Sequence, residues 1–331
     1  MRSRMLERLR RPWSDHRAEQ LLGAVACLLA VGIILMIVFV LRGAWPTFSH
    51  EGLSWLGSGG NLDSQVGAMV NTSSHPPGSA YYLHAWPLIW GTLLTAGFAV
   101  LFGLAIALAT AIFIVDFAPP VVKRTMKPVI RLLAAIPGVL YGLIGILVIV
   151  PFINRDILTQ GEQESVIHVI SLSGGGLGVA ILLVTLMITP IMTALITDAL
   201  ESVPRAWREG AIALGLNPLR ATLAVSIRAI RPAIVSATAL ATARAIGEAI
   251  VVSMVSGGSA FAPNPLDGRI FFLEPVETLA SEVVRQADNL SIPALHSTLY
   301  AIASLLLFSS FVLSLASYLI RLPMRRYQVS D

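Results

Sequence analysis

The chain has little charge, little lysine and hardly any cysteine. Only 13% of its 331 residues are charged, whereas soluble domains average about 25%. Lysine occurs twice, and Cys27 is the single cysteine, so an internal disulfide is excluded. What the chain has instead is 55% hydrophobic residues and a mean hydropathy of +0.76. This composition excludes a soluble globular protein and predicts a polytopic membrane protein.

Several motifs of catalysis and metal binding are also absent. The sequence contains no G-x-x-x-x-G-K-[ST], no H-E-x-x-H, no C-x-x-C and no G-x-S-x-G. The six histidines are scattered without the spacing of a metal site. We therefore predict no catalytic residue and no bound metal or cofactor, and the sequence favours a transporter or channel over an enzyme.

Apolar runs define the predicted topology. A membrane-spanning helix needs about 20 apolar residues, and six stretches qualify: 20–42, 88–115, 132–153, 177–199, 233–256 and 297–320. The first run is too long for the core of a signal peptide, so we expect it to be retained. The prediction is an all-α polytopic membrane protein with six transmembrane helices.

The basic residues favour one orientation. Alternate segments outside the runs, both termini included, contain 18 arginines and lysines, whereas the other segments contain three. Cytoplasmic segments are the basic ones, so we predict both termini in the cytoplasm. Residues 1–19 and 321–331 are then a cytoplasmic N-terminal segment and tail, 43–87 is an external loop and 200–232 is cytoplasmic. The isoelectric point of about 9.6 thus reflects loop charges that orient the helices. The expected surroundings are membrane lipid, and no nucleic-acid partner is expected.

The external segments contain two kinds of sequence. Residues 57–79 are rich in glycine, serine, asparagine and proline, which predicts turns rather than a domain. The stretch "EPVETLASEVVRQA" at 274–287 is instead a candidate for a short helix.

The segment 200–232 contains the signals of a short helix and a sharp stop. Ser202 is a candidate cap and Pro204 suits a first turn. Gly215 suits a left-handed helix end, and the Asn217-Pro218 pair prevents continuation.

This short helix has one apolar stripe, because Trp207, Ala211 and Leu214 follow helical spacing. Such a helix either lies on the membrane surface or docks into a soluble partner, and the pattern alone leaves both open.

The same segment resembles a known family. "EGAIALG" at 209–215 is similar to the EAA loop of bacterial ABC importer permeases. Five further resemblances, to the phosphate-uptake (Pst) permeases and closest to the PstC-type subunit, follow in the family's order: "AWPLIWGTLLT" (85–95), "LLAAIPGVLYGLIGILVIVPFI" (132–153), "MITPIMTALITDALESVPRAWREGAIALG" (187–215), "ARAIGEAIVVSMVSG" (243–257) and "EPVETLASEV" (274–283). The chain departs from the family pattern at Gly138, Gly210, Arg228 and Ala249.

The resemblance implies a fold, a function and partners. It implies an ABC type I importer permease core at 88–320, in the inner (cytoplasmic) membrane, and transport of inorganic phosphate. It implies an ATPase subunit dimer that binds ATP and contacts Arg205, Trp207, Glu209 and Gly215. It also implies a PstA-like second permease and an extracytoplasmic phosphate-binding protein. Alternatives are a permease for sulfate or molybdate, or an ATP-independent secondary transporter.

Two charges interrupt the fifth apolar run. Arg244 and Glu248 are four residues apart, so on one helix they would share a face and be able to pair. They form an intrahelical pair, or a bridge to the second permease, or a substrate pathway in which Arg244 binds the anion and Glu248 orients or competes for it. Gly247 between them predicts the close approach of a neighbouring backbone.

Two further sets of residues have open interpretations. Gly138, Gly142 and Gly145 in the third run predict close helix packing. Thr189, Thr193 and Thr197 recur every four residues in the fourth run. These threonines either line a polar path or donate to their own helix carbonyls.

Overall fold

The computed structural model describes residues 13–57, 62–71, 83–166, 172–259 and 262–324. Within these ranges the chain is helical and has no strand. Five helical segments are long and apolar enough to cross a membrane: Ala18–Leu56, Trp86–Phe117, Gly138–Ile157, Leu177–Ser202 and Leu295–Leu322. A sixth exists if Pro218–Ala229 and Arg231–Ile246, which meet at 72°, count as one span. The predicted all-α polytopic fold is confirmed.

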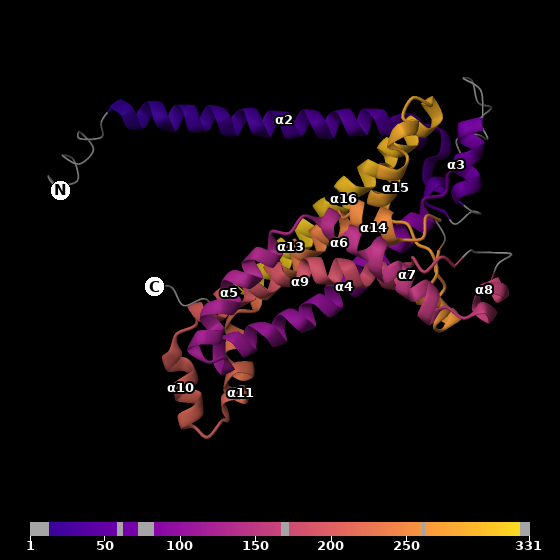
Figure 1. Cartoon of the computed structure of the whole chain (residues 1–331). Coiled ribbons are helices and arrows are strands. Elements are labelled where there is room, and N and C mark those ends of the chain that lie inside the picture. The colour runs from indigo at the N-terminus through magenta and orange to yellow at the C-terminus, as the bar shows by residue number, and fades with distance from the viewer. Residues whose placement is uncertain (1–12, 58–61, 72–82, 167–171, 260–261, 325–331) are drawn as a thin grey trace.

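Helix α9 (Leu177–Ser202) is the centre of the bundle. Two thirds of its most apolar stretch are buried inside the protein, and its Leu183, Ile188 and Ile196 belong to the largest apolar core. Helices α4 (Trp86–Ile112) and α13 (Arg231–Ile246) pack along it. Figure 1 shows these helices running side by side through the bundle.

Helix α2 (Trp13–Glu51) is the opposite case. None of its most apolar stretch is buried, and Figure 1 shows the helix projecting away from the bundle along most of its length. It meets α16 (Pro293–Met324) near its C-terminal end, where Gly43 lies directly against the Tyr300 ring. The helix therefore continues past the predicted boundary at 42.

The third predicted run is divided by a proline. The amphipathic helix α5 (Pro120–Ala134) continues through the predicted start at 132, and α6 (Gly138–Ile144) begins after Pro137. Proline lacks an N–H and disfavours a helical residue before it, so it separates the two helices. The span then continues through the π-helical η4 (Gly145–Ile149), α7 (Val150–Phe152) and the π-helical η5 (Ile153–Ile157).

The fifth predicted run, 233–256, is not one helix. Helix α13 ends at Ile246, and α14 (Ile250–Val255) begins after a break at residues 247–249. Gly247 occupies the C-cap position of α13, where a residue of low helix propensity costs least. The expectation of a continuous helix here is wrong.

The remaining elements connect the spans. The predicted external loop 43–87 contains the 3₁₀ helix η1 (Gly52–Leu56) and α3 (Leu62–Asn71). Helix α3 lies within 57–79, so the prediction of turns alone is wrong there, while 58–61 and 72–82 lie outside the described residues. Helix α15 (Leu279–Arg285) confirms the short helix expected around 274–287. The other α-helices are α8 (Gln160–Val166), α10 (Arg205–Ala213), α11 (Pro218–Ala221) and α12 (Ile227–Ala229). Two further π-helical turns are η3 (Phe113–Phe117) and η6 (Thr222–Ser226). The 3₁₀ turns are η7 (Pro265–Asp267), η8 (Ile270–Phe272) and η9 (Ala287–Asn289).

The bundle has two distinct ends. Figure 1 shows α10 and α11 at one end and α3, α8 and α15 at the other. The described chain stops at Met324, near the end that carries α10. The terminal arginines that contribute to the orientation argument, before residue 13 and after residue 324, lie outside the described residues.

Candidate functional site

Residues 203–230 form two short helical arms, of which the first is α10 and the second begins with α11. They are named the coupling loop because they lie within the segment 200–232, which the resemblance predicts to couple to the ATPase. Gly215 has a φ of +93° and ends the turn after α10 in the left-handed region, as predicted. The Asn217 side chain caps α11 by accepting a hydrogen bond from the Arg220 N–H at 2.8 Å. The Ser202 cap is wrong, because Ser202 is the last residue of α9 and donates to the Ala199 carbonyl.

The first arm presents apolar side chains to its surroundings. Trp207 is 45% exposed and Leu214 is 85% exposed, and α10 contains no buried residue. Ile212 and Leu219 are also exposed. A surface of this kind on a projecting helix is typical of a docking site. Of the predicted coupling residues, Arg205, Trp207, Glu209 and Gly215 are all exposed.

A cavity of about 210 Å³ lies between the arms of the loop and the end of the second span. Arg205 and Glu209 line it together with a residue that the sequence analysis overlooked, Asp116. Asp116 lies in η3 and forms an ion pair with Arg208 of α10. Its other oxygen accepts a hydrogen bond from the Thr222 hydroxyl at 2.5 Å. The signal available in the sequence was an acidic residue directly after the apolar run 88–115.

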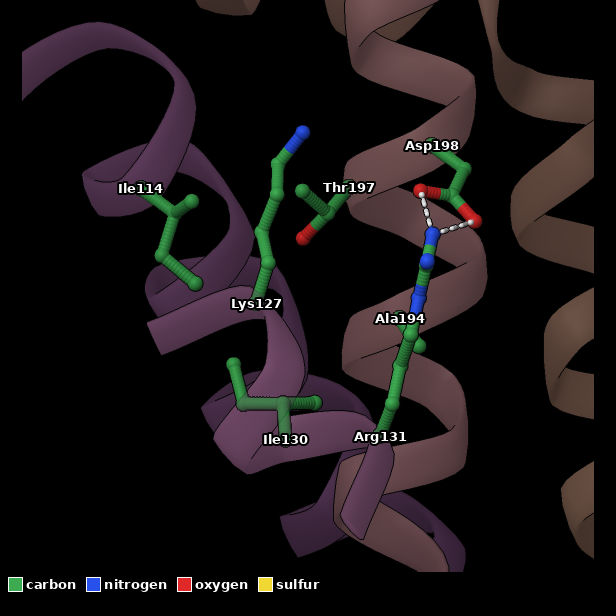
Figure 2. Close-up of a pocket in the computed structure, with 7 residues that line it drawn as sticks. All are labelled: Ile114, Lys127, Ile130, Arg131, Ala194, Thr197 and Asp198. Carbon is green, nitrogen blue, oxygen red and sulfur yellow. Dashed lines mark hydrogen bonds and ion pairs between the residues drawn. The ribbon is translucent and has the colours of Figure 1, made fainter. Parts of the chain in front are cut away.

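A second group of charges joins α5 to α9. Lys123 and Lys127 both pair with Glu201, and Arg131 pairs with Asp198 at 3.1 Å. Figure 2 shows the Arg131 guanidinium pointing at the Asp198 carboxylate. These pairs fasten α5 along α9 without contacting the coupling loop.

Thr197 faces the same region. Its hydroxyl is buried without a hydrogen-bond partner and lines a cavity of about 10 Å³ with Ile114 and Ala194 (Figure 2). That volume suits at most one water molecule. The other two threonines of the predicted series donate to their own helix, Thr189 to the Thr185 carbonyl at 2.6 Å and Thr193 to the Thr189 carbonyl at 2.8 Å.

Arg244 lies in α13, before the break in the fifth run, and Glu248 lies within the break. The ion pairs of the described residues do not include one between them. The expected shared helical face is wrong, because α13 ends before Glu248. Instead, Glu248 Oε1 accepts a hydrogen bond from the Val251 N–H at 3.1 Å, which caps the start of α14.

The two side chains both lie near α6. A Cβ atom on Gly138 would be 3.1 Å from Glu248 Oε1, so the carboxylate packs against that glycine. Arg244 lies near Tyr141, which is in the same helix α6. Both side chains are partly exposed. Gly247 itself is exposed, and its Cβ would meet only carbonyls of its own helix, so the predicted close approach is wrong.

The opposite end of the bundle contains buried carboxylates. Arg285 Nε lies 2.9 Å from Glu277 Oε1, and its Nη2 lies 3.0 Å from Glu282 Oε2. Burial raises the pKa of Glu274 to about 7; the Asn264 N–H lowers that pKa and the neighbouring Asp267 raises it. Among the described residues, no group of three or more His, Cys, Asp or Glu side chains is arranged to hold a metal ion.

The family described as "Binding-protein-dependent transport system inner membrane component" matches residues 117–326. The chain belongs to this family. It is therefore a permease component of the inner membrane, and it crosses that membrane several times.

Individual relatives are more specific. The chain is 33% identical over 279 residues to the probable phosphate transport system permease protein PstC of Methanocaldococcus jannaschii, covering 83% of each chain. It is 26% identical over 286 residues to PstC of Haemophilus influenzae, covering 84% of each. These relatives confirm the resemblance predicted from the sequence.

A solved structure agrees with the fold. The chain superposes on a permease chain of the crystal structure of a bacterial alginate ABC transporter, in complex with its alginate-bound periplasmic protein, with a TM-score of 0.55. The match covers 97% of this chain and 99% of the other at 14% identity. The predicted ABC importer permease fold is confirmed, and this likeness concerns the fold alone.

Proposed function

We propose that this chain is one of two permease subunits of an ATP-driven importer for inorganic phosphate. The observation that carries the proposal is its similarity, over most of its length, to relatives named phosphate transport permeases. ATP binds and is hydrolysed on a separate ATPase subunit dimer, so this chain is not an enzyme and holds no cofactor. A PstA-like second permease completes the pathway, and an extracytoplasmic phosphate-binding protein delivers the anion.

The ATPase docks on the coupling loop. The support for this step is an exposed apolar surface on α10 that contains no buried residue. Trp207 anchors the contact, and Arg205 and Glu209 flank it beside the cavity described above. This contact fixes the orientation, because it places α10 in the cytoplasm. The C-terminal end of the described chain lies near α10 (Figure 1). We therefore propose that the C-terminus is cytoplasmic, and the basic residues at both ends of the sequence favour the same side for the N-terminus.

Arg244 is the residue that meets the anion. An arginine near the centre of a membrane costs about 2.5–3.5 kcal/mol on insertion scales, so it requires a cavity or a partner. No carboxylate of the described residues forms an ion pair with it. Its planar fork matches the geometry of phosphate oxygens. Glu248 completes the pathway: it holds the start of α14, and its charge is available to Arg244 once the anion has left.

The function is tested in a reconstituted complex. The two permeases, the ATPase dimer and the binding protein are assembled in proteoliposomes, and uptake of labelled phosphate is measured with and without ATP. We expect ATP-dependent uptake that unlabelled phosphate suppresses and that equal sulfate or molybdate leaves unchanged. Suppression by sulfate or molybdate would assign another oxoanion, and uptake without ATP would contradict the importer.

The role of Arg244 is tested by Arg244→Gln. We expect uptake to fall by about tenfold or more, because one charge-assisted contact to an ion contributes about 1.5–3 kcal/mol. Complex assembly and basal ATPase activity should remain. Arg231→Gln is the matched control, since Arg231 is exposed at the start of the same helix. Normal uptake by the Arg244→Gln variant would show that Arg244 does not bind the anion in the pathway.

A further inference from the structure

Asp116 occupies an unusual position at the end of the second span. It lies in the π-helical turn η3, which closes with a hydrogen bond from the Ala118 N–H to the Phe113 carbonyl at 2.8 Å. Its side chain is only 7% exposed. A carboxylate this buried is costly unless charged or polar groups satisfy both of its oxygens.

The two oxygens bind different arms of the coupling loop. Oδ1 pairs with Arg208, in the middle of α10. Oδ2 accepts from Thr222, which follows α11 at the start of η6 and is 1% exposed. One side chain of the second span therefore holds both arms, before and after the turn at Gly215.

The first arm depends on this contact. Helix α10 contains no buried residue, so packing does not fix its direction. Val203, which has an extended backbone after the end of α9, and Pro204, which precedes the first residue of α10, connect the two helices. A turn connects α10 to α11. Without an anchor, a force applied to α10 would rotate it about these connections. Charge-assisted hydrogen bonds with low exposure are strong enough to oppose that rotation.

We propose that Asp116 is the positioning residue that makes movement of the coupling loop reach the membrane helices. The proposal rests on the function proposed above, in which an ATPase moves α10. Asp116 passes that movement to α4, which packs against both α9 and α13. Helix α13 carries Arg244, so the contact links the docking surface to the pathway through packed elements.

The experiment uses the complete complex in proteoliposomes with phosphate-loaded binding protein. Two quantities are measured: phosphate transported per ATP hydrolysed, and stimulation of the ATPase by the loaded binding protein. The variants are Asp116→Asn, Arg208→Gln, the double variant and Asp116→Glu. Asp198→Asn is the matched control, because it also removes a carboxylate–arginine pair but does not contact the coupling loop.

We expect Asp116→Asn and Arg208→Gln each to lower the phosphate-to-ATP ratio about fivefold, because each variant removes the same contact between two coupled residues. The phosphate-to-ATP ratio of the double variant should be no lower than that of the poorer single variant. Asp116→Glu should recover part of the loss, and Asp198→Asn should match the wild type. ATP hydrolysis should continue in every variant.

Three results would overturn the proposal. They are an unchanged ratio in Asp116→Asn, losses that simply multiply in the double variant, and losses explained entirely by less assembled complex. A wild-type complex that fails to move phosphate would instead contradict the proposed function, so the two failures are distinguishable.

Discussion

Glycine has different structural roles in two facing segments of the bundle. The first is α6 with η4, Gly138–Ile149, and the second is the broken segment from Arg244 to Val255. Helix α14 packs against α6 along this contact. The sequence suggests close approach by glycine in both segments, yet only the first has it.

The contrast is visible in what each glycine touches. A Cβ atom on Gly145 would lie 2.5 Å from Leu183 Cδ1 and 2.6 Å from Val255 Cγ1. One on Gly142 would lie 2.7 Å from Met254 Sδ. On Gly247, the nearest atom is its own helix's Ala243 carbonyl oxygen at 3.4 Å. Glycine permits packing in the first segment and ends a helix in the second.

The largest loss of stability is expected for Gly145→Ala. The added methyl group would overlap Leu183 and Val255, which are both buried and have little room to move. Overpacking of this kind costs about 1–3 kcal/mol. The melting midpoint of the purified permease in detergent should fall clearly below that of the wild type. A midpoint equal to the wild-type value would show that α14 can shift away from η4.

A smaller loss of stability is expected at Glu248. Two variants there separate the contribution of the capping hydrogen bond from that of the negative charge. Glu248→Ala removes the acceptor for the Val251 N–H, and loss of a helix cap costs about 1 kcal/mol. Glu248→Gln keeps an oxygen acceptor, so it should retain most of the stability and of the phosphate uptake. Both are compared by melting midpoint and by uptake in proteoliposomes.

Equal stability losses in the two variants would contradict the capping role. Ser253→Ala is the matched control, because Ser253 is in α14 and its hydroxyl donates to a carbonyl of the same turn, that of Ile250. Its melting midpoint should stay near that of the wild type.

The spans could be predicted because a bilayer requires long apolar runs, which composition reveals directly. The same property did not distinguish α2 from α9, since both are strongly apolar while only α9 is buried by neighbours. Hydropathy reports only that a residue favours removal from water. Contact with lipid and contact with protein both remove it from water, so hydropathy does not distinguish them.

The contacts between charges were harder to predict. Arg244 and Glu248 are close in sequence, and a continuous helix would have brought them together, but the break at residues 247–249 prevents that geometry. Asp116 and Arg208 are 92 positions apart and form a pair. That pair depends on the direction in which α10 leaves α9, which no local pattern encodes.

The smallest effect is expected for Gly247→Ala, and it is the sharpest test of the comparison. Gly247 has a φ of −81°, which alanine adopts without strain, and a methyl group would meet no neighbouring element. The change in stability should therefore stay within about 0.5 kcal/mol. Melting midpoint and phosphate uptake are measured beside Gly145→Ala, which makes the same chemical change. If both variants lost equal stability, the difference between the two segments would be refuted, and glycine in the fifth span would be required for packing after all.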